Sequence, residues 1–223
     1  MRSSHLFRRA VAGLCAAAML CGGMAAAAAA APVPPVAPAA VEATNAAPSD
    51  AELRAAFSKF IVTYDEQTGG WDLSSPQEQA SMDKKSCGLY PYMYVENDGI
   101  SFNMMLTYAG GKKLDLKTVN VSADDDLYTF TCDEDYGGGY DQDLGCWFDL
   151  ELFQLDDDQI SWLSEWLNAK SVSAVFVGRD GTTQSYALTK ENRTAIQEMV
   201  TAYNLMLSST VEQCEPILSS LAK

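Results

Sequence analysis

Histidine is almost absent from this 223-residue chain, in which His5 is the single example. His5 lies in an amino-terminal stretch that we expect to be removed on export. A mature protein without histidine excludes Ser-His-Asp and Cys-His catalysis, and it excludes metal sites held by imidazole. Positive charge is also scarce, with 15 Lys and Arg against 30 Asp and Glu. The formal net charge of −15 repels nucleic acid and anionic lipid, which excludes nucleic-acid binding.

Residues 1–31 have the pattern of a secretory signal peptide. Arg2, Arg8 and Arg9 precede an alanine-rich apolar run that ends before Pro32. The run is weakly hydrophobic and no basic cluster follows it, so cleavage is favoured over anchoring. We expect a periplasmic or secreted protein with no transmembrane segment after processing. Loss of the three arginines would change the formal charge from −15 to −18.

The remaining chain is predicted to contain a short tether and one folded domain. Residues 32–48 are almost wholly Ala, Pro and Val, which favours an extended, disordered tether. Residues 49–223 form the domain, which begins with Ser49 and Glu52 in a capping box. Apolar residues at helical spacing, including Ile61 and Tyr64, then predict a first helix that extends through these positions.

Alternating patterns predict an α+β fold in which an antiparallel meander of about five strands is followed by a carboxyl-terminal α-β-β-α unit. The turns between the strands are short, as in antiparallel neighbours. Helices are expected to pack on this sheet. The five strands are predicted at about 88–96, 100–108, 114–122, 127–133 and 146–154. The unit after them is predicted as a helix from Asp156, strands at about 171–178 and 183–188, and a helix capped by Thr189 that precedes a break at Pro216.

Four cysteines remain after processing, an even number in an oxidising compartment, so two disulfides are expected. Cys132 and Cys146 are predicted to face the core and to pair, with Asp149 and Glu151 on the outward face of the second strand. Cys87 would then pair with Cys214. A catalytic thiol is not expected because the sequence offers no base to activate it.

The loop from Asp133 to Asp143 is rich in acids and glycine. Calcium is the one cofactor that it suggests, with oxygen ligands from Asp133, Asp135, Asp141 and Asp143. The spacing does not fit an EF-hand, because Gly137 and Leu144 occupy two positions that require oxygen ligands. The alternative is a solvated hairpin loop without metal.

Tyr90, Tyr92 and Tyr94 share one face of the first predicted strand. Such rings can stack on a sugar or peptide, but more often they lie half buried beneath a helix with their hydroxyls in water. Trp162 and Trp166, one helical turn apart, are predicted to be core or interface residues.

Fourteen acids and no basic residue lie between Thr118 and Ala169. This block predicts a docking face for something basic, to which Asp124, Asp125 and Asp126 would contribute. A glycosidase pair of carboxylates could also be present, but so many acids single out no pair.

Residues 127–207 resemble the carboxyl-terminal part of secreted bacterial proteins of the invasion-associated locus B type. The resemblance is carried by a cysteine on a strand, a loop, a second cysteine, a helix that runs to Leu167-Asn168-Ala169-Lys170, and the strand Val175-Phe176-Val177-Gly178. It implies a small periplasmic or surface-associated binding protein with no catalytic residues to carry over.

We therefore expect an exported, non-enzymatic binding protein of the periplasm or bacterial cell envelope, with a basic protein or envelope component as its partner. The alternative is a carboxylate-dependent hydrolase of cell-wall polysaccharide. Two carboxyl groups in one concave cleft would favour the hydrolase, and acids spread over a convex face would favour binding.

Overall fold

A computed structural model describes residues 47–77, 87–96, 99–132 and 138–222. These residues form four helices and ten strands, and every strand pair is antiparallel. The predicted α+β class is therefore confirmed. No helix in the described part of the chain is long and apolar enough to cross a membrane.

The helices are α1 (Asp50–Phe57), α3 (Asp157–Asn168), α4 (Lys190–Leu207) and α5 (Val211–Leu221). Each follows a residue whose side-chain oxygen accepts a backbone N–H of the first turn, namely Ser49, Asp156, Thr189 and Thr210. These bonds satisfy donors that a helix start would otherwise leave without partners. The predicted caps at Ser49 and Thr189 are confirmed.

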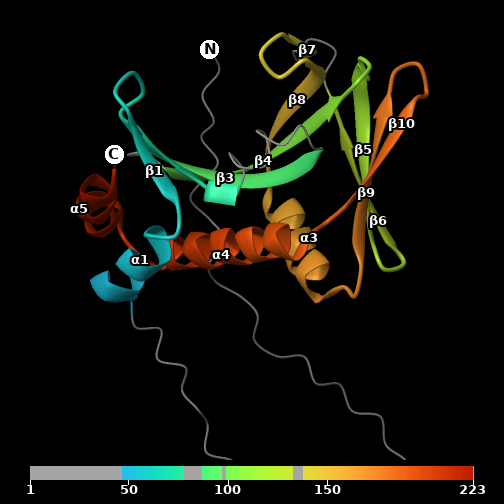
Figure 1. The fold of residues 1–223 in the computed structure, drawn as a ribbon. Coiled ribbons are helices and arrows are strands. Elements are labelled where there is room, and N and C mark those ends of the chain that lie inside the picture. Colours follow the sequence, from blue (N-terminus) through green and yellow to red (C-terminus); the bar gives the residue numbers. More distant parts are fainter. Residues whose placement is uncertain (1–46, 78–86, 97–98, 133–137, 223) are drawn as a thin grey trace, which may run out of the picture. The chain divides into compact units, whose positions relative to one another are not determined.

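The strands form two sheets (Figure 1). The order in the six-stranded sheet is β1 (Ile61–Asp65), β2 (Gly70–Ser74), β3 (Gly88–Glu96), β4 (Gly99–Gly110), β8 (Cys146–Gln154) and β7 (Gly138–Asp141). The order in the four-stranded sheet is β10 (Thr183–Ala187), β9 (Val172–Gly178), β5 (Leu116–Ala123) and β6 (Asp126–Thr131). The predicted strands are present, but they are not one meander: after Gly110 the chain leaves β4, and β5 begins the second sheet.

The first helix is shorter than predicted, because Ile61–Asp65 is a strand that pairs with β2. Ile61, Val62 and Thr63 are β-branched and lose side-chain freedom in a helix, whereas they pack well on a pleated sheet. Gly69, at a φ of +74°, closes the turn in a left-handed conformation that glycine adopts without strain.

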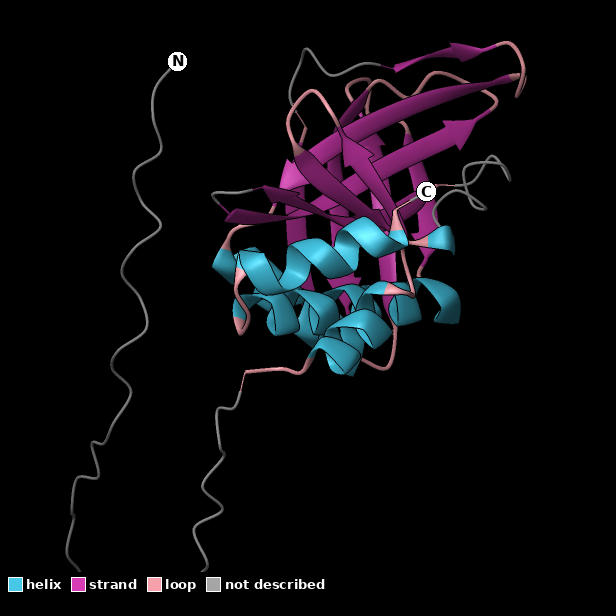
Figure 2. Ribbon diagram, turned by 90° about the vertical axis from the view of Figure 1, so that its left-hand side faces the viewer, coloured by secondary structure: helices cyan, strands magenta, loops and turns pink. Residues whose placement is uncertain are grey.

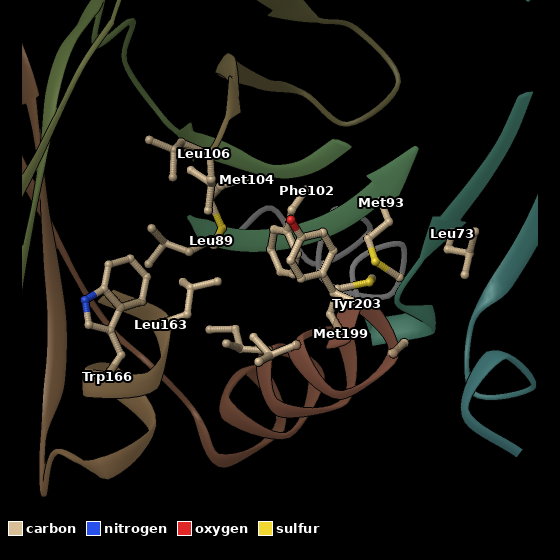
Figure 3. Close-up of a cluster of buried hydrophobic side chains, with 14 of the residues drawn as sticks. Leu73, Leu89, Met93, Phe102, Met104, Leu106, Leu163, Trp166, Met199 and Tyr203 are labelled. Atoms are coloured by element: carbon tan, nitrogen blue, oxygen red, sulfur yellow. The ribbon is translucent and has the colours of Figure 1, made fainter. Parts of the chain in front are cut away.

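The helices gather on one side of the strands (Figure 2). Leu89 and Met93 of β3 and Phe102 of β4 face α4, where Tyr203 packs edge-on against Phe102 with ring centroids 5.3 Å apart (Figure 3). The core continues to Leu163 and Trp166 of α3, both fully buried. One face of β3 is thereby covered by helices.

The two sheets are joined where the chain passes between β4 and β5. The backbone N–H of Asp115 donates to Asp149 Oδ2 of β8 (3.0 Å), and the Asp115 carbonyl accepts from the N–H of Arg179 after β9 (2.9 Å). Gly178 lies against the carbonyl oxygen of Leu114. A Cβ on residue 178 would be only 2.2 Å from that oxygen. Only glycine allows this approach of the two backbones.

The carboxyl-terminal helix α5 holds the start of the folded domain. Gln213 Nε2 donates to the carbonyl of Pro48 (2.8 Å) and to Asp50 Oδ1 (2.9 Å), and Pro48 is buried. Pro48, one residue before the predicted boundary at Ser49, is therefore packed on the folded domain. The predicted break at Pro216 is wrong, because α5 continues through this residue to Leu221.

Candidate functional site

A small hollow with room for about one water molecule lies between α5 and the adjoining ends of β2 and β3, and we call it the β3–α5 cleft. It is lined by Gly69, Trp71, Val95, Glu96, Val211, Cys214, Glu215 and Leu218. The strand side contributes an aromatic ring and a carboxylate, and the helix side contributes a carboxylate and an apolar surface. The lining contains no basic residue.

The aromatic wall of the cleft is positioned by the β1–β2 hairpin. Trp71 pairs with Tyr64 across the hairpin, and their ring centroids are 4.5 Å apart at 47°. Trp71 also pairs with Val95 of β3, so its ring lies on the sheet face that α5 covers. Tyr64 is 45% exposed, which leaves the aromatic pair accessible from solvent.

The two carboxylates of the cleft have no partner among the described residues. Glu96 ends β3 and is half-buried, whereas Glu215 lies on α5 and is exposed. Neither side chain forms an ion pair or hydrogen bond with another described residue. Cys214, Leu218 and Val95 are buried beneath them. The cleft thus combines an aromatic face, an apolar floor and two uncompensated negative charges.

The predicted disulfides are absent from the structure, in which none of the four cysteines is joined to another. The structure does not form the Cys87–Cys214 pair, which stays a prediction: Cys87 precedes the first residue of β3, while Cys214 lines the cleft at Val95, at the other end of that strand. A strand rises about 3.3 Å per residue, so roughly 25 Å separates the two positions. A disulfide requires Cα atoms within about 7 Å.

Cys132 and Cys146 are both buried, but they belong to different sheets. Cys132 follows β6 and donates its N–H to the carbonyl of Lys117 (2.9 Å), whereas Cys146 begins β8. The sequence indicated that both were inward-facing, but it did not reveal the division into two sheets. The structure does not join the two cysteines, and their pairing stays a prediction.

The predicted orientation of β8 is also reversed along most of the strand. Asp149 and Glu151 are each 5% exposed, while Phe148 and Leu152 are 37% and 39% exposed. Burial raises the pKa of Asp149, and the N–H that Asp115 donates to its carboxylate opposes this effect. This hydrogen bond offsets part of the free-energy cost of burying the Asp149 carboxyl group. These two acids form a buried pair on one side of the strand.

Only part of the predicted calcium loop can be placed, because Asp133 and Asp135 lie outside the described residues. Asp141 Oδ1 accepts the backbone N–H groups of Asp143 and Leu144, both at 2.9 Å, so this carboxylate closes the turn before β8. Asp143 is exposed. Among the residues that the structure describes, no three potential ligands form a metal-binding group.

The three tyrosines share one face of β3, but they do not form an exposed stack. Tyr90 is 2% exposed, and Tyr92 and Tyr94 are half-buried. The hydroxyl of Tyr94 donates to Thr68, and its ring covers Gly70, where a Cβ would be 2.6 Å from the ring. Helix α4 packs on the opposite face of β3. Tyr94 therefore serves to hold the hairpin that carries Trp71.

Acids lie at both ends of α3, but three of them accept internal hydrogen bonds: Asp156, which caps the helix, Asp124 and Glu165. Asp124 accepts the backbone N–H groups of Lys170 and Ser171, each at 3.0 Å, and Glu165 accepts from the hydroxyl of Tyr128. This bond raises the pKa of Tyr128 to about 12. The other exposed acids at the ends of α3 form neither an ion pair nor a side-chain hydrogen bond with another described residue, and we call these four the α3 acids: Asp125, Asp126, Asp157 and Asp158.

Replacement of Asp124 by alanine is expected to lower the melting temperature at neutral pH, whereas Asp125→Ala is expected to leave it unchanged. The two N–H groups that Asp124 accepts lower its pKa in the folded protein. Its stabilising contribution is therefore complete above the ordinary Asp pKa of about 4, and it is lost as the pH falls through the lower folded value. Thermal unfolding between about pH 6 and 2 would test this. Equal effects of both substitutions would contradict it.

The cleft could not be predicted from the sequence because its two sides are far apart in the chain. Residues 69–96 contribute one side and residues 211–218 contribute the other. One local signal was present: the β-branched run at Ile61–Thr63, the turn at Gly69 and the alternating segment Gly70–Ser74 together predict a hairpin. That signal would have placed Trp71 on a strand, but it would not have revealed α5 opposite it.

Trp162 and Trp166 are core residues, as predicted. Trp166 is fully buried against Tyr128 and Phe130, and Trp162 is partly buried against the same two rings.

Comparison of the chain with protein-family models, curated proteins and solved structures finds no match. The resemblance to the invasion-associated locus B type therefore stays a prediction.

Proposed function

We propose that this is an exported, non-enzymatic binding protein of the periplasm or cell envelope, and that its acidic surface docks a basic partner. The observation that supports this most is the exposure of the α3 acids, which have no ion-pair partner among the described residues. Exposed charges of one sign attract an oppositely charged partner over long range and increase its association rate.

A labelled ten-residue peptide of alternating lysine and glycine provides a direct test. Binding is expected at low salt, and the association rate should fall steeply at about 0.5 M salt, where the Debye length is roughly 4 Å. A chelator should have no effect. If chelator rather than salt abolished binding, a metal site in the 133–143 loop would replace this proposal. Absence of binding at low salt would overturn it, and the acids would then serve solubility alone.

The second candidate function is hydrolysis of cell-wall polysaccharide, which is favoured by the presence of Glu96, Glu215 and Trp71 in the lining of the β3–α5 cleft. Glycosidases use a pair of carboxylates, and an aromatic ring can stack on a sugar. Incubation with purified cell-wall polysaccharide should release no reducing ends if the protein only binds. Release that Glu96→Gln or Glu215→Gln abolished would favour the hydrolase.

A further inference from the structure

We propose that strand β10 is the interface of a homodimer, in which the four-stranded sheets of two copies join edge to edge into one continuous sheet. β10 is the terminal strand of its sheet, where β9 is its partner (Figure 1). Four of its five residues are exposed, and Tyr186 is half-buried. An open sheet edge presents backbone N–H and C=O groups to which the strand of another chain can pair.

The register of β10 identifies which of its residues offer these groups. The N–H of Leu188 donates to the carbonyl of Val172 (3.0 Å), so Leu188 is bonded towards β9. Bonded and outward-facing residues alternate along an antiparallel strand. The residues of β10 that direct their backbone groups away from β9 are therefore Thr183, Ser185 and Ala187. The Ser185 carbonyl accepts from the Gln184 side chain (3.1 Å), and the other outward groups have no partner among the described residues.

β10 differs from the other sheet edges in its lack of charge. The terminal strands of the two sheets are β1, β7, β6 and β10. β1 ends at Asp65, β7 ends at Asp141, and β6 begins at Asp126, whereas β10 contains neither an acidic residue nor proline. Charged side chains on an edge hinder its pairing with another chain, and like charges directly opposite each other are destabilising. β10 is thus the edge at which two copies can pair without such repulsion.

The charge around β10 favours a second copy as the occupant. The whole chain has a formal net charge of −15, so two copies repel each other over most of their surface. The segment 179–193 is an exception, because its basic residues outnumber its acidic ones: Arg179, Lys190 and Arg193 against Asp180 and Glu191. A lysine-rich segment would find no excess of negative charge here, whereas another acidic copy can approach.

A two-fold arrangement centred on Ser185 uses the full length of β10. Outward-facing residues form the bonded pairs of an antiparallel ladder, so Ser185 would lie opposite Ser185 of the other copy, and Thr183 opposite Ala187. The same register brings the turn that contains Asp180 towards Lys190 of the other copy, and symmetry repeats this contact. Asp180 and Lys190 are both exposed and of opposite charge. One strand per copy is a small interface, so the dimer should be weak.

Sedimentation velocity at about 0.15 M salt tests this pairing, at protein concentrations between about 5 and 500 µM. The average mass is expected to rise from that of a monomer to nearly that of a dimer over this range. Ser185→Pro should stay monomeric at the highest concentration. The N–H that proline removes points away from β9, so the pairing within the sheet is retained.

Thr129→Pro is the matched control on β6, the opposite edge of the same sheet. Cys132 donates its N–H to Lys117 of the chain that leads into β5, so Thr129 faces outward by the same alternation. This variant should dimerise like the wild type. Circular dichroism and the melting temperature confirm that each variant is folded before its mass is compared.

Ser185→Lys provides a second test that does not alter the backbone. It would place two lysines opposite each other at the two-fold axis, and it should likewise remain monomeric at about 500 µM. A wild-type protein that stays monomeric at this concentration would overturn the proposal, and so would a Ser185→Lys variant that dimerises as the wild type does. Loss of the dimer in Thr129→Pro alone would assign the interface to β6 and equally overturn it.

Discussion

Replacing Trp166 with alanine is expected to lower the free energy of unfolding by about 3–5 kcal/mol. Trp166 is fully buried on α3, where its ring packs against Tyr128 and Phe130 with centroids 5.9 and 6.2 Å away. Its Nε1 has no hydrogen-bond partner among the described residues, so the loss would come from packing and from the cavity that remains.

Urea unfolding of the two proteins would measure the effect, and an unchanged dependence on urea concentration would show that unfolding stays two-state. Leu207→Ala is the control, because Leu207 is 59% exposed on α4 and its truncation should change the free energy by less than about 0.5 kcal/mol. A loss below about 1 kcal/mol in Trp166→Ala would contradict the assignment of this residue to the core.

Gly178→Ala is expected to destabilise the protein by about 1–3 kcal/mol, because a Cβ at this position would be 2.2 Å from the carbonyl oxygen of Leu114. That oxygen belongs to the backbone of the connection between the two sheets, so it cannot move aside as a flexible side chain would. The strain would act where Asp115 bonds to β8 and to Arg179.

Gly111→Ala is the matched control, since nothing lies within 4 Å of a Cβ at that position, four residues before Asp115. Its melting temperature should stay within a degree or so of the original, or rise slightly, because alanine has less conformational freedom when unfolded. Equal melting temperatures for the two variants would show that the sheets are not joined at Gly178.

The sequence predicted elements whose causes are local. The capping box at Ser49 and the cap at Thr189 depend on residues within one turn, and the predicted strands depend on alternation within each segment. The burial of Asp149 could not be predicted in this way. It becomes tolerable because the N–H of Asp115, which is distant in sequence, donates to its carboxylate, and no pattern within β8 contains that partner.

The residues of the candidate site were even harder to predict from local sequence patterns. Glu96 and Glu215 are two of 30 acids in the chain, and only the packing of α5 beside the end of β3 distinguishes them from the others. The sequence did predict an acidic protein that docks something basic, because charge is visible without a fold. It assigned Asp124 to the docking face, whereas in the structure this carboxylate accepts hydrogen bonds from two backbone N–H groups that follow α3.

Docking of a basic side chain is tested most directly by the indole N–H signals of ¹⁵N-tryptophan-labelled protein, titrated with the lysine-glycine peptide at low salt. The chain contains four tryptophans, and Trp162→Phe would identify the signal of Trp162, which lies on α3 one helical turn after Asp158. Docking at the α3 acids predicts that the Trp162 signal shifts in proportion to occupancy while the signal of the fully buried Trp166 stays in place. Saturable peptide binding that leaves the Trp162 signal unmoved would contradict it.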